Sequence, residues 1–112
     1  MRFTEHERVK WTLGGMLFTW DDRKAASNFK KHGVRFSEAA AIFLDEYVSV
    51  EINSIDEYTG EERWDTIGSI GGNLLMFVVY VERIQIDGND IIRIISARRA
   101  EKEERRRYVN GN

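Results

Sequence analysis

The sequence contains no cysteine and only two histidines, His6 and His32. Without cysteine the chain forms neither a disulfide framework nor a thiolate metal site, and two histidines are too few for a histidine-rich site. We therefore expect neither a structural nor a catalytic metal, and no other cofactor.

Long apolar runs are also missing from the sequence. No segment approaches the roughly 20 consecutive apolar residues of a membrane span. The first residues, from Met1 to Glu7, lack the apolar core of a secretory signal peptide. We therefore expect a cytoplasmic protein that does not contact a membrane.

The chain shows neither internal repeats nor a low-complexity linker. Its 112 residues fit one compact domain. The hydrophobic residues, 42% of the total, supply enough apolar surface to offset the entropy of ordering a chain of this length. We therefore expect the protein to fold alone.

The chain also has no excess of positive charge, because its formal net charge is −2 and its pI is about 5.7. This balance excludes the global basicity of a protein that coats nucleic-acid phosphates. The charges are unevenly distributed, however, because residues 45–65 are acidic whereas residues 93–107 carry seven cations against three carboxylates. A second basic set lies within residues 23–35. Phosphate could bind between the two basic segments if folding brings them together.

The N-terminal residues differ from the rest of the chain. Residues 1–17 sustain no apolar periodicity and are interrupted by Gly14 and Gly15. This predicts an N-terminal extension ahead of a domain over residues 18–112. Residues 17–19 are predicted to form a short strand that leads into the first helix.

Two helices are expected next. Acidic residues begin the first, which is predicted over residues 21–32, and Gly33 follows its end as glycine commonly does. Ser37 is suited to cap a second helix over residues 37–45, which is rich in strong helix formers.

The second half of the chain has the period of strands. Four are predicted, with turns at residues 71–73 and 87–89, and they cover residues 47–52, 63–70, 74–81 and 90–97. Residues 100–108 predict a closing helix. The order predicts an α+β fold with two N-terminal helices, a four-stranded antiparallel sheet and a C-terminal helix, in which one sheet face stays partly open. The core is expected to contain Trp20, Phe29, Phe36, Phe43 and residues 74–81.

Three motifs follow one another along the chain. The first comprises Phe18-Thr19-Trp20-Asp21, Lys24-Ala25, Asn28, Lys31-His32-Gly33-Val34, Phe36 and Glu38-Ala39-Ala40. The second is Gly60-Glu61-Glu62-Arg63, and the third is Arg93-Ile94-Ile95-Ser96-Ala97-Arg98-Arg99-Ala100 with Glu104-Arg105 and Tyr108. In this order, over residues 18–108, the sequence closely resembles the BrnT family.

The resemblance implies a RelE-like fold and a ribonuclease activity that arrests translation and growth. It also implies neutralisation by a DNA-binding antitoxin of the BrnA type, so that operator DNA is contacted only through the antitoxin. Homodimerisation is left open. The expected function is therefore the toxin component of a type II toxin–antitoxin system, acting on RNA as a metal-independent endoribonuclease.

RNA cleavage requires a base for the 2′-hydroxyl, cations for the charge that develops on the phosphate, and an acid for the 5′-oxygen. Arg98 follows the last predicted strand and Arg63 stands at the entry to another, and a guanidinium suits bidentate phosphate binding. Both are predicted to be catalytic. The alternative for Arg98 is an ion pair with Glu101 or another nearby carboxylate.

Two further residues are catalytic candidates. Glu62 is a hypothesis for the general base, although adjacent residues of a regular strand point to opposite faces, so Glu62 and Arg63 do not easily share a site. Its alternative is a carboxylate of an acidic loop. His32 is the only histidine of the predicted domain, and histidine serves as acid or base near neutral pH. Its alternative is a cap at a helix end.

Four residues are candidates for binding the substrate. Lys24 and Lys31 share a helix face with Asn28, and this face could equally be a solvated surface. Arg93 and Tyr108 complete the set. The tyrosine could stack on a base, although packing on the sheet is the commoner fate of a helix-borne tyrosine.

The competing function is a non-catalytic, degenerate toxin that binds its antitoxin and serves as a co-repressor. Toxicity on expression distinguishes the two. Sequence-specific DNA binding by the chain itself is disfavoured because no helix-turn-helix pair precedes a basic recognition helix.

Overall fold

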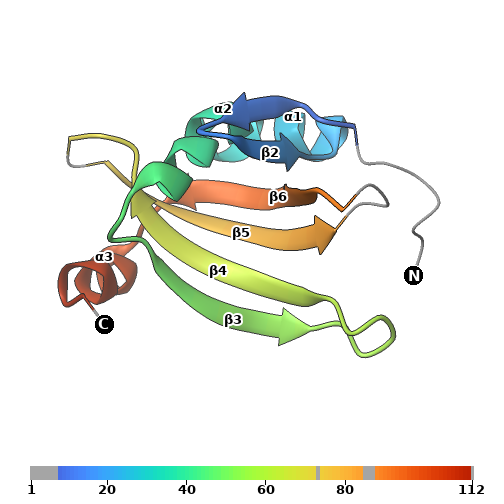
Figure 1. The fold of residues 1–112 in the computed structure, drawn as a ribbon. Coiled ribbons are helices and arrows are strands. Elements are labelled where there is room, and N and C mark those ends of the chain that lie inside the picture. Colours follow the sequence, from blue (N-terminus) through green and yellow to red (C-terminus); the bar gives the residue numbers. More distant parts are fainter. Residues whose placement is uncertain (1–7, 73, 85–87, 112) are drawn as a thin grey trace.

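The computed structural model describes residues 8–72, 74–84 and 88–111. Its centre is a six-stranded mixed sheet with the strand order β1-β2-β6-β5-β4-β3 (Figure 1). The strands are β1 (Trp11–Leu13), β2 (Met16–Thr19), β3 (Ser49–Ile55), β4 (Glu62–Ser69), β5 (Leu75–Ile84) and β6 (Asp90–Arg99). The helices are α1 (Asp22–His32), α2 (Phe36–Ala39), the 3₁₀ helix η1 (Ala40–Leu44) and α3 (Lys102–Val109).

This architecture shows that the predicted four-stranded antiparallel sheet is wrong. β2 confirms the short strand predicted over residues 17–19, but it forms a hairpin with β1 and runs parallel to β6, with Phe18 beside Ile92. Gly14 and Gly15, which interrupt the sequence pattern, form the hairpin turn with φ of 58° and 79°. Strands this short show little alternation of apolar and polar residues. The pairing of β2 with β6, which lies far along the chain, leaves no pattern in the local sequence. The domain boundary after residue 17, which falls within β2, stays a prediction.

The second predicted helix, over residues 37–45, is also corrected. α2 spans only four residues and gives way to the tighter turns of η1. The backbone N–H of Arg35, not Ser37, begins the helix by donating to Glu38 Oε1 at 2.9 Å. The chain then packs directly on β4, where a Cβ added to Gly68 would lie 2.7 Å from Ile42 Cβ. This tertiary contact overrides the helix propensity of the segment.

α1 confirms the helix predicted over residues 21–32. The Asp21 carboxylate accepts hydrogen bonds from the backbone N–H groups of Lys24 at 3.0 Å and Arg23 at 2.9 Å. These bonds lower the pKa of Asp21. Gly33 ends the helix at φ 71°, a conformation that costs glycine little.

The other elements lie where the sequence predicts, with shifted ends. β3 begins at Ser49 and continues to Ile55, through part of the expected loop, and α3 begins at Lys102. β5 and β6 are each longer than predicted, ending at Ile84 and Arg99. The predicted turn residues 73 and 87 lie outside the described residues.

The main core lies between the sheet and the helices α1, α2 and η1. Phe36, buried as predicted, is joined by Phe18, Ile42, Val78 and Ile94. Figure 1 shows α1 and α2 beside β2 and β6, whereas α3 lies beside β4 and β3. One sheet face therefore carries the main core, and the other faces α3.

Besides Phe36, two of the aromatic residues predicted for the core are confirmed and one is wrong. Trp20 and Phe43 pack against the core cluster as expected. Phe29 is 42% exposed, and the Arg35 guanidinium lies 4.5 Å from its ring centroid. Leu74, at the start of the predicted apolar strand, is exposed as well.

Asn28 connects α1 to the sheet and occupies the position on α1 that faces β6. Its Nδ2 donates to the carbonyls of Ala97 at 2.8 Å and Val34 at 3.1 Å, and its Oδ1 accepts the Ala97 N–H at 3.1 Å. The side chain is buried. The helix face that it shares with the two lysines is therefore not wholly solvated.

We predict that Asn28→Ala lowers the free energy of unfolding by about 2 to 4 kcal/mol, because it leaves buried backbone groups of Ala97 without a partner. Ser27→Ala, at an exposed position of the same helix, is the control and is expected to change the free energy of unfolding by less than about 0.5 kcal/mol. Denaturant unfolding followed by circular dichroism measures both. Equal stability of the two variants would contradict the structural role of Asn28.

Candidate active site

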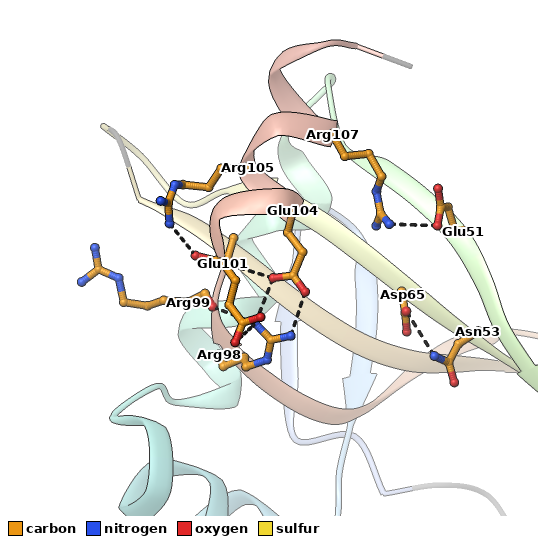
Figure 2. A network of polar contacts seen from close by, with 10 residues as sticks. Glu51, Asn53, Asp65, Arg98, Arg99, Glu101, Glu104, Arg105 and Arg107 are labelled. Atoms are coloured by element: carbon orange, nitrogen blue, oxygen red, sulfur yellow. Dashed lines mark hydrogen bonds and ion pairs between the residues drawn. The ribbon is translucent and has the colours of Figure 1, made fainter.

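Strand alternation places a polar set on the sheet face turned away from α1. Arg98 on β6 pairs with Phe77 on β5, and Asp65 and Ser96 lie on either side of Val79. α3 crosses this face, as Figure 2 shows. We call it the α3 face, and the residues discussed below lie on it or beside it.

Arg98 is held in a fixed orientation on the α3 face. Its guanidinium carbon lies 4.4 Å from the centroid of the Phe77 ring. Its Nη1 and Nη2 donate to the two carboxylate oxygens of Glu104 at 2.9 and 2.7 Å, and Nη1 also donates to the Arg99 carbonyl at 3.1 Å (Figure 2). The bond to Glu104 raises the pKa of Arg98. The ion-pair alternative is therefore observed, chiefly with Glu104 rather than Glu101, which is 3.9 Å away.

Of the five N–H groups of a guanidinium, these bonds use three. Within the described residues, the edge of Arg98 formed by Nε and the second Nη2 hydrogen has no partner. The side chain is 28% exposed. A phosphate could therefore bind this edge without displacing Glu104.

A second cluster of polar side chains lies beside the cluster around Arg98, where α3 contacts β3 and β4. Arg107 Nη1 donates to Glu51 Oε1 at 2.8 Å, and Asn53 Nδ2 donates to Asp65 Oδ2 at 3.1 Å (Figure 2). Asp65 Oδ1 and the Nε and Nη2 of Arg107 are buried without a partner among the described residues. Buried polar atoms normally have one, supplied by protein, water or a ligand. These three atoms therefore retain hydrogen-bonding capacity that no described residue satisfies.

The local sequence explains how α3 comes to lie on this face. Acidic residues occupy its first turn and basic residues its last, in agreement with the helix dipole. Glu104 Oε1 accepts the backbone N–H of Glu101 at 2.7 Å, which starts the helix. The Tyr108 hydroxyl donates to Asp45 Oδ2 at 2.6 Å and fixes the far end. That bond, together with burial, raises the pKa of Tyr108 to about 12.

The structure brings some of the predicted site residues together. Arg98 and Arg93 lie on β6, and Arg93 faces Thr19 of β2 in register and is close enough to Asp21 to help lower its pKa. Arg63 is exposed two residues before Asp65, so alternation places it on the α3 face. The hydroxyl of Tyr108 donates to Asp45, and stacking of its ring on a base stays a prediction.

Other predicted site residues lie elsewhere. Glu62 is on the opposite sheet face, where it lines a hollow with Trp64. His32 is the last residue of α1 and is exposed. Lys24 and Lys31 are exposed on the same helix. Their roles remain predictions.

The sequence reasoning missed four residues of the α3 face, namely Glu51, Asp65, Glu104 and Arg107. The sequence contains a signal for two of these residues, Asp65 and Arg107. Asp65 shares a strand face with Arg63 because it follows two positions later, and Arg107 follows Glu104 by one helical turn. Nothing in the sequence indicates that the two pairs meet. No group of three or more metal-binding side chains occurs in the described part of the chain.

We predict that Glu104→Gln destabilises the protein by about 2 kcal/mol at pH 7. Burial by itself raises the pKa of Glu104, but the hydrogen bonds from Arg98 and the Glu101 backbone outweigh it and hold the pKa below 4.5. A lowered carboxyl pKa stabilises the fold above pH 4.5, and this contribution is lost as the pH falls below that value.

Unfolding by denaturant at pH 7 and pH 3 tests this prediction. The difference between wild type and Glu104→Gln is expected to shrink at pH 3. Glu103→Gln is the control, because its carboxylate is 80% exposed and pairs with Arg106 alone among the described residues, and it is expected to have little effect at either pH. A penalty for Glu104→Gln that is the same at both pH values would disprove the role of its charge.

Comparison with known proteins gives a family match. The family model described as "Ribonuclease toxin, BrnT, of type II toxin-antitoxin system" matches residues 20–104. A solved structure of the Brucella abortus ribonuclease toxin BrnT is similar, with 21% identity and a TM-score of 0.49 over 74% of this chain and 94% of that chain. No curated protein matches the sequence.

The described helices include none that is long and apolar enough to cross a membrane. The family match covers most of the chain, including the whole of α1, the strands β3 to β6 and the first turn of α3. The chain therefore belongs to the BrnT family of ribonuclease toxins of type II toxin–antitoxin systems.

Proposed function

We propose that this toxin is a metal-independent endoribonuclease that cleaves RNA on the α3 face and thereby inhibits translation and growth. The observation that carries the proposal is the position of Arg98. Its guanidinium is fixed between Phe77 and Glu104, yet one edge stays without a partner among the described residues. Such a preorganised donor pair can stabilise the charge that develops on a phosphate during cleavage.

The same face offers a proton acceptor. Asp65 lies on β4, which is separated from β6 and Arg98 by β5. Its buried Oδ1 lacks a partner among the described atoms. In the proposed reaction, Asp65 accepts the proton of the ribose 2′-hydroxyl, and the 2′-oxygen then attacks the adjacent phosphorus. The bond from phosphorus to the 5′-oxygen breaks, giving a 2′,3′-cyclic phosphate and a free 5′-hydroxyl once the leaving oxygen gains a proton. Arg98 and Arg63 stabilise the charged phosphate.

The other predicted residues have subsidiary roles in this proposal. Lys24, Lys31 and Arg93 attract the RNA backbone, which makes binding dependent on salt. His32 remains a candidate for the proton transfers and is tested beside Asp65. Glu62, the predicted base, is tested as well, although it lies on the sheet face opposite Asp65 and Arg98. The proposed partner is a BrnA-type antitoxin that carries the contact with operator DNA, and the proposed site of action is the cytoplasm.

One observation favours the alternative of a non-catalytic toxin that serves as an antitoxin-binding co-repressor. Two arginines of the α3 face are already paired with carboxylates, Arg98 with Glu104 and Arg107 with Glu51. Such pairing reduces the positive potential available to RNA. Expression of the wild-type chain without its antitoxin decides between the two, because only an active toxin arrests growth.

We predict that Arg98→Ala lowers the rate of RNA cleavage by at least about 100-fold, the usual effect of removing one donor to a developing anion. Asp65→Asn is expected to have a comparable effect if Asp65 is the base. The assay is cleavage of a labelled RNA oligonucleotide in EDTA, together with growth after induction. His32→Ala and Glu62→Gln are measured in parallel.

Arg98→Ala also breaks the ion pair that holds α3, so Glu104→Gln is the matched control. It removes the same ion pair but leaves the guanidinium over Phe77, and it is expected to lose much less cleavage activity than Arg98→Ala. An equal loss of activity in both variants would assign Arg98 to docking of α3 rather than to chemistry. Loss of wild-type activity in EDTA would disprove the metal-independent mechanism.

A further inference from the structure

The sheet face opposite α3 carries a groove at the end that the helices leave uncovered. A hollow of about 540 Å³ is lined by residues that include Glu62, Trp64, Glu82, Ile84 and Asp90. A second hollow, of about 390 Å³, shares Glu82 and Asp90 with the first and continues to β2 and β6. No residue of α1, α2 or η1 lines either hollow. We call the two together the acidic groove.

Negative charge dominates the acidic groove. Glu61 at its edge is neutralised by Arg83 at 2.9 Å. Glu62, Glu82 and Asp90 have no ion pair in the described part of the chain. Burial and then the charge of Glu82 raise the pKa of Tyr80 to about 12. A groove with three unneutralised carboxylates repels RNA and attracts a cationic ligand.

The floor of the groove is apolar and continues onto an exposed apolar surface. Trp64 is half-buried, and Ile84 is 65% exposed. Ile52 pairs with Trp64 and Val50 with Thr66, so both project from the same sheet face, and both are more than 40% exposed. A contiguous exposed apolar surface rimmed by charge is typical of an interaction site.

We propose that the acidic groove binds a cationic amphipathic segment of the antitoxin. Lysine or arginine side chains of the segment pair with Glu82, Asp90 and Glu62, and a guanidinium can also lie over the exposed part of Trp64. The apolar side of the segment covers Ile84 and Ile52. The inference rests on the proposed toxin function, since it takes the antitoxin as the partner.

A second copy of this chain is a poorer fit to the groove. The groove is negatively charged, and the net charge of the chain is also negative. A second copy is therefore repelled by the groove unless it binds through one of its basic segments. A metal ion is disfavoured too, because no group of three or more metal-binding side chains occurs among the described residues. Charge complementarity therefore selects a basic protein segment.

The position of the groove separates antitoxin binding from RNA cleavage. The groove lies on the sheet face of Trp64 and Glu82, whereas Asp65 and Arg98 project from the other face. Variants of Glu82, Asp90 and Ile84, none of which is a catalytic candidate, are therefore expected to keep the activity of the free toxin. This separation allows the two proposals to fail independently.

The test is the charge-reversal variant Glu82→Lys with Asp90→Lys. The control is Glu46→Lys, which makes the same kind of change at an exposed position outside the groove. Binding to a BrnA-type antitoxin, the proposed partner, is measured by calorimetry with the full-length proteins. We expect the double variant to weaken binding at least about 100-fold and the control to change it less than about threefold. In cells, the double variant is expected to arrest growth even when the antitoxin is co-expressed.

Ile84→Asp tests the apolar floor independently and is expected to weaken antitoxin binding at least about tenfold. Melting curves verify that each variant is folded, and cleavage of an RNA oligonucleotide by the isolated variants measures the toxin function separately. Antitoxin binding at wild-type strength by both groove variants would overturn the inference, whatever the outcome of the cleavage assay. A change in the oligomeric state of the isolated chain caused by Ile84→Asp would assign the groove to a second copy and would also overturn it.

Discussion

The hydrogen bonds of the Asn28 amide are the interaction on which the arrangement of the molecule depends. β2 pairs with β6 only as far as Arg93, so the edge of β6 beyond that residue lacks a neighbouring strand. At Ala97 the side-chain amide of Asn28 supplies the donor and acceptor that a strand would otherwise provide. The same amide binds the Val34 carbonyl and fixes the segment that leads into α2. One residue thus sets α1 against the strand that carries Arg93 and Arg98.

The position of α3 depends on the residues that it meets on the other side of the sheet. Its length of eight residues is too short for a stable isolated helix. Polar contacts hold it, chiefly the bidentate Arg98–Glu104 pair, the Arg107–Glu51 pair and the bond from Tyr108 to Asp45. The two ion pairs engage Arg98 and Arg107, two of the seven cations of residues 93–107. The basic tail therefore serves partly as a structural element, while the edge of Arg98 that has no partner among the described residues stays available to a ligand.

The two faces of the sheet thus differ in charge and in exposure. The α3 face presents fixed guanidinium groups beside a buried carboxylate oxygen, whereas the acidic groove presents carboxylates around Trp64 and Ile84. A protein with a net charge of only −2 can in this way offer one face to an anion and the other to a cationic partner. Alternation along β4 is the reason, because it sends Arg63 and Asp65 to one face and Glu62 and Trp64 to the other.

The sequence by itself determined the parts of this protein that depend on local chemistry. The Asp21 cap and Gly33 set the limits of α1, the apolar runs located β5 and β6, and the spaced motifs indicated the family. Tertiary structure alone decided the rest. The hairpin of β1 and β2 became part of the sheet because β6 offered a parallel edge, and the predicted second helix was cut short where Ile42 meets Gly68. Asp65 came to lie near Arg107 because α3 folds back across strands that are distant in sequence. Such contacts join segments that share no periodicity, so no local pattern encodes them.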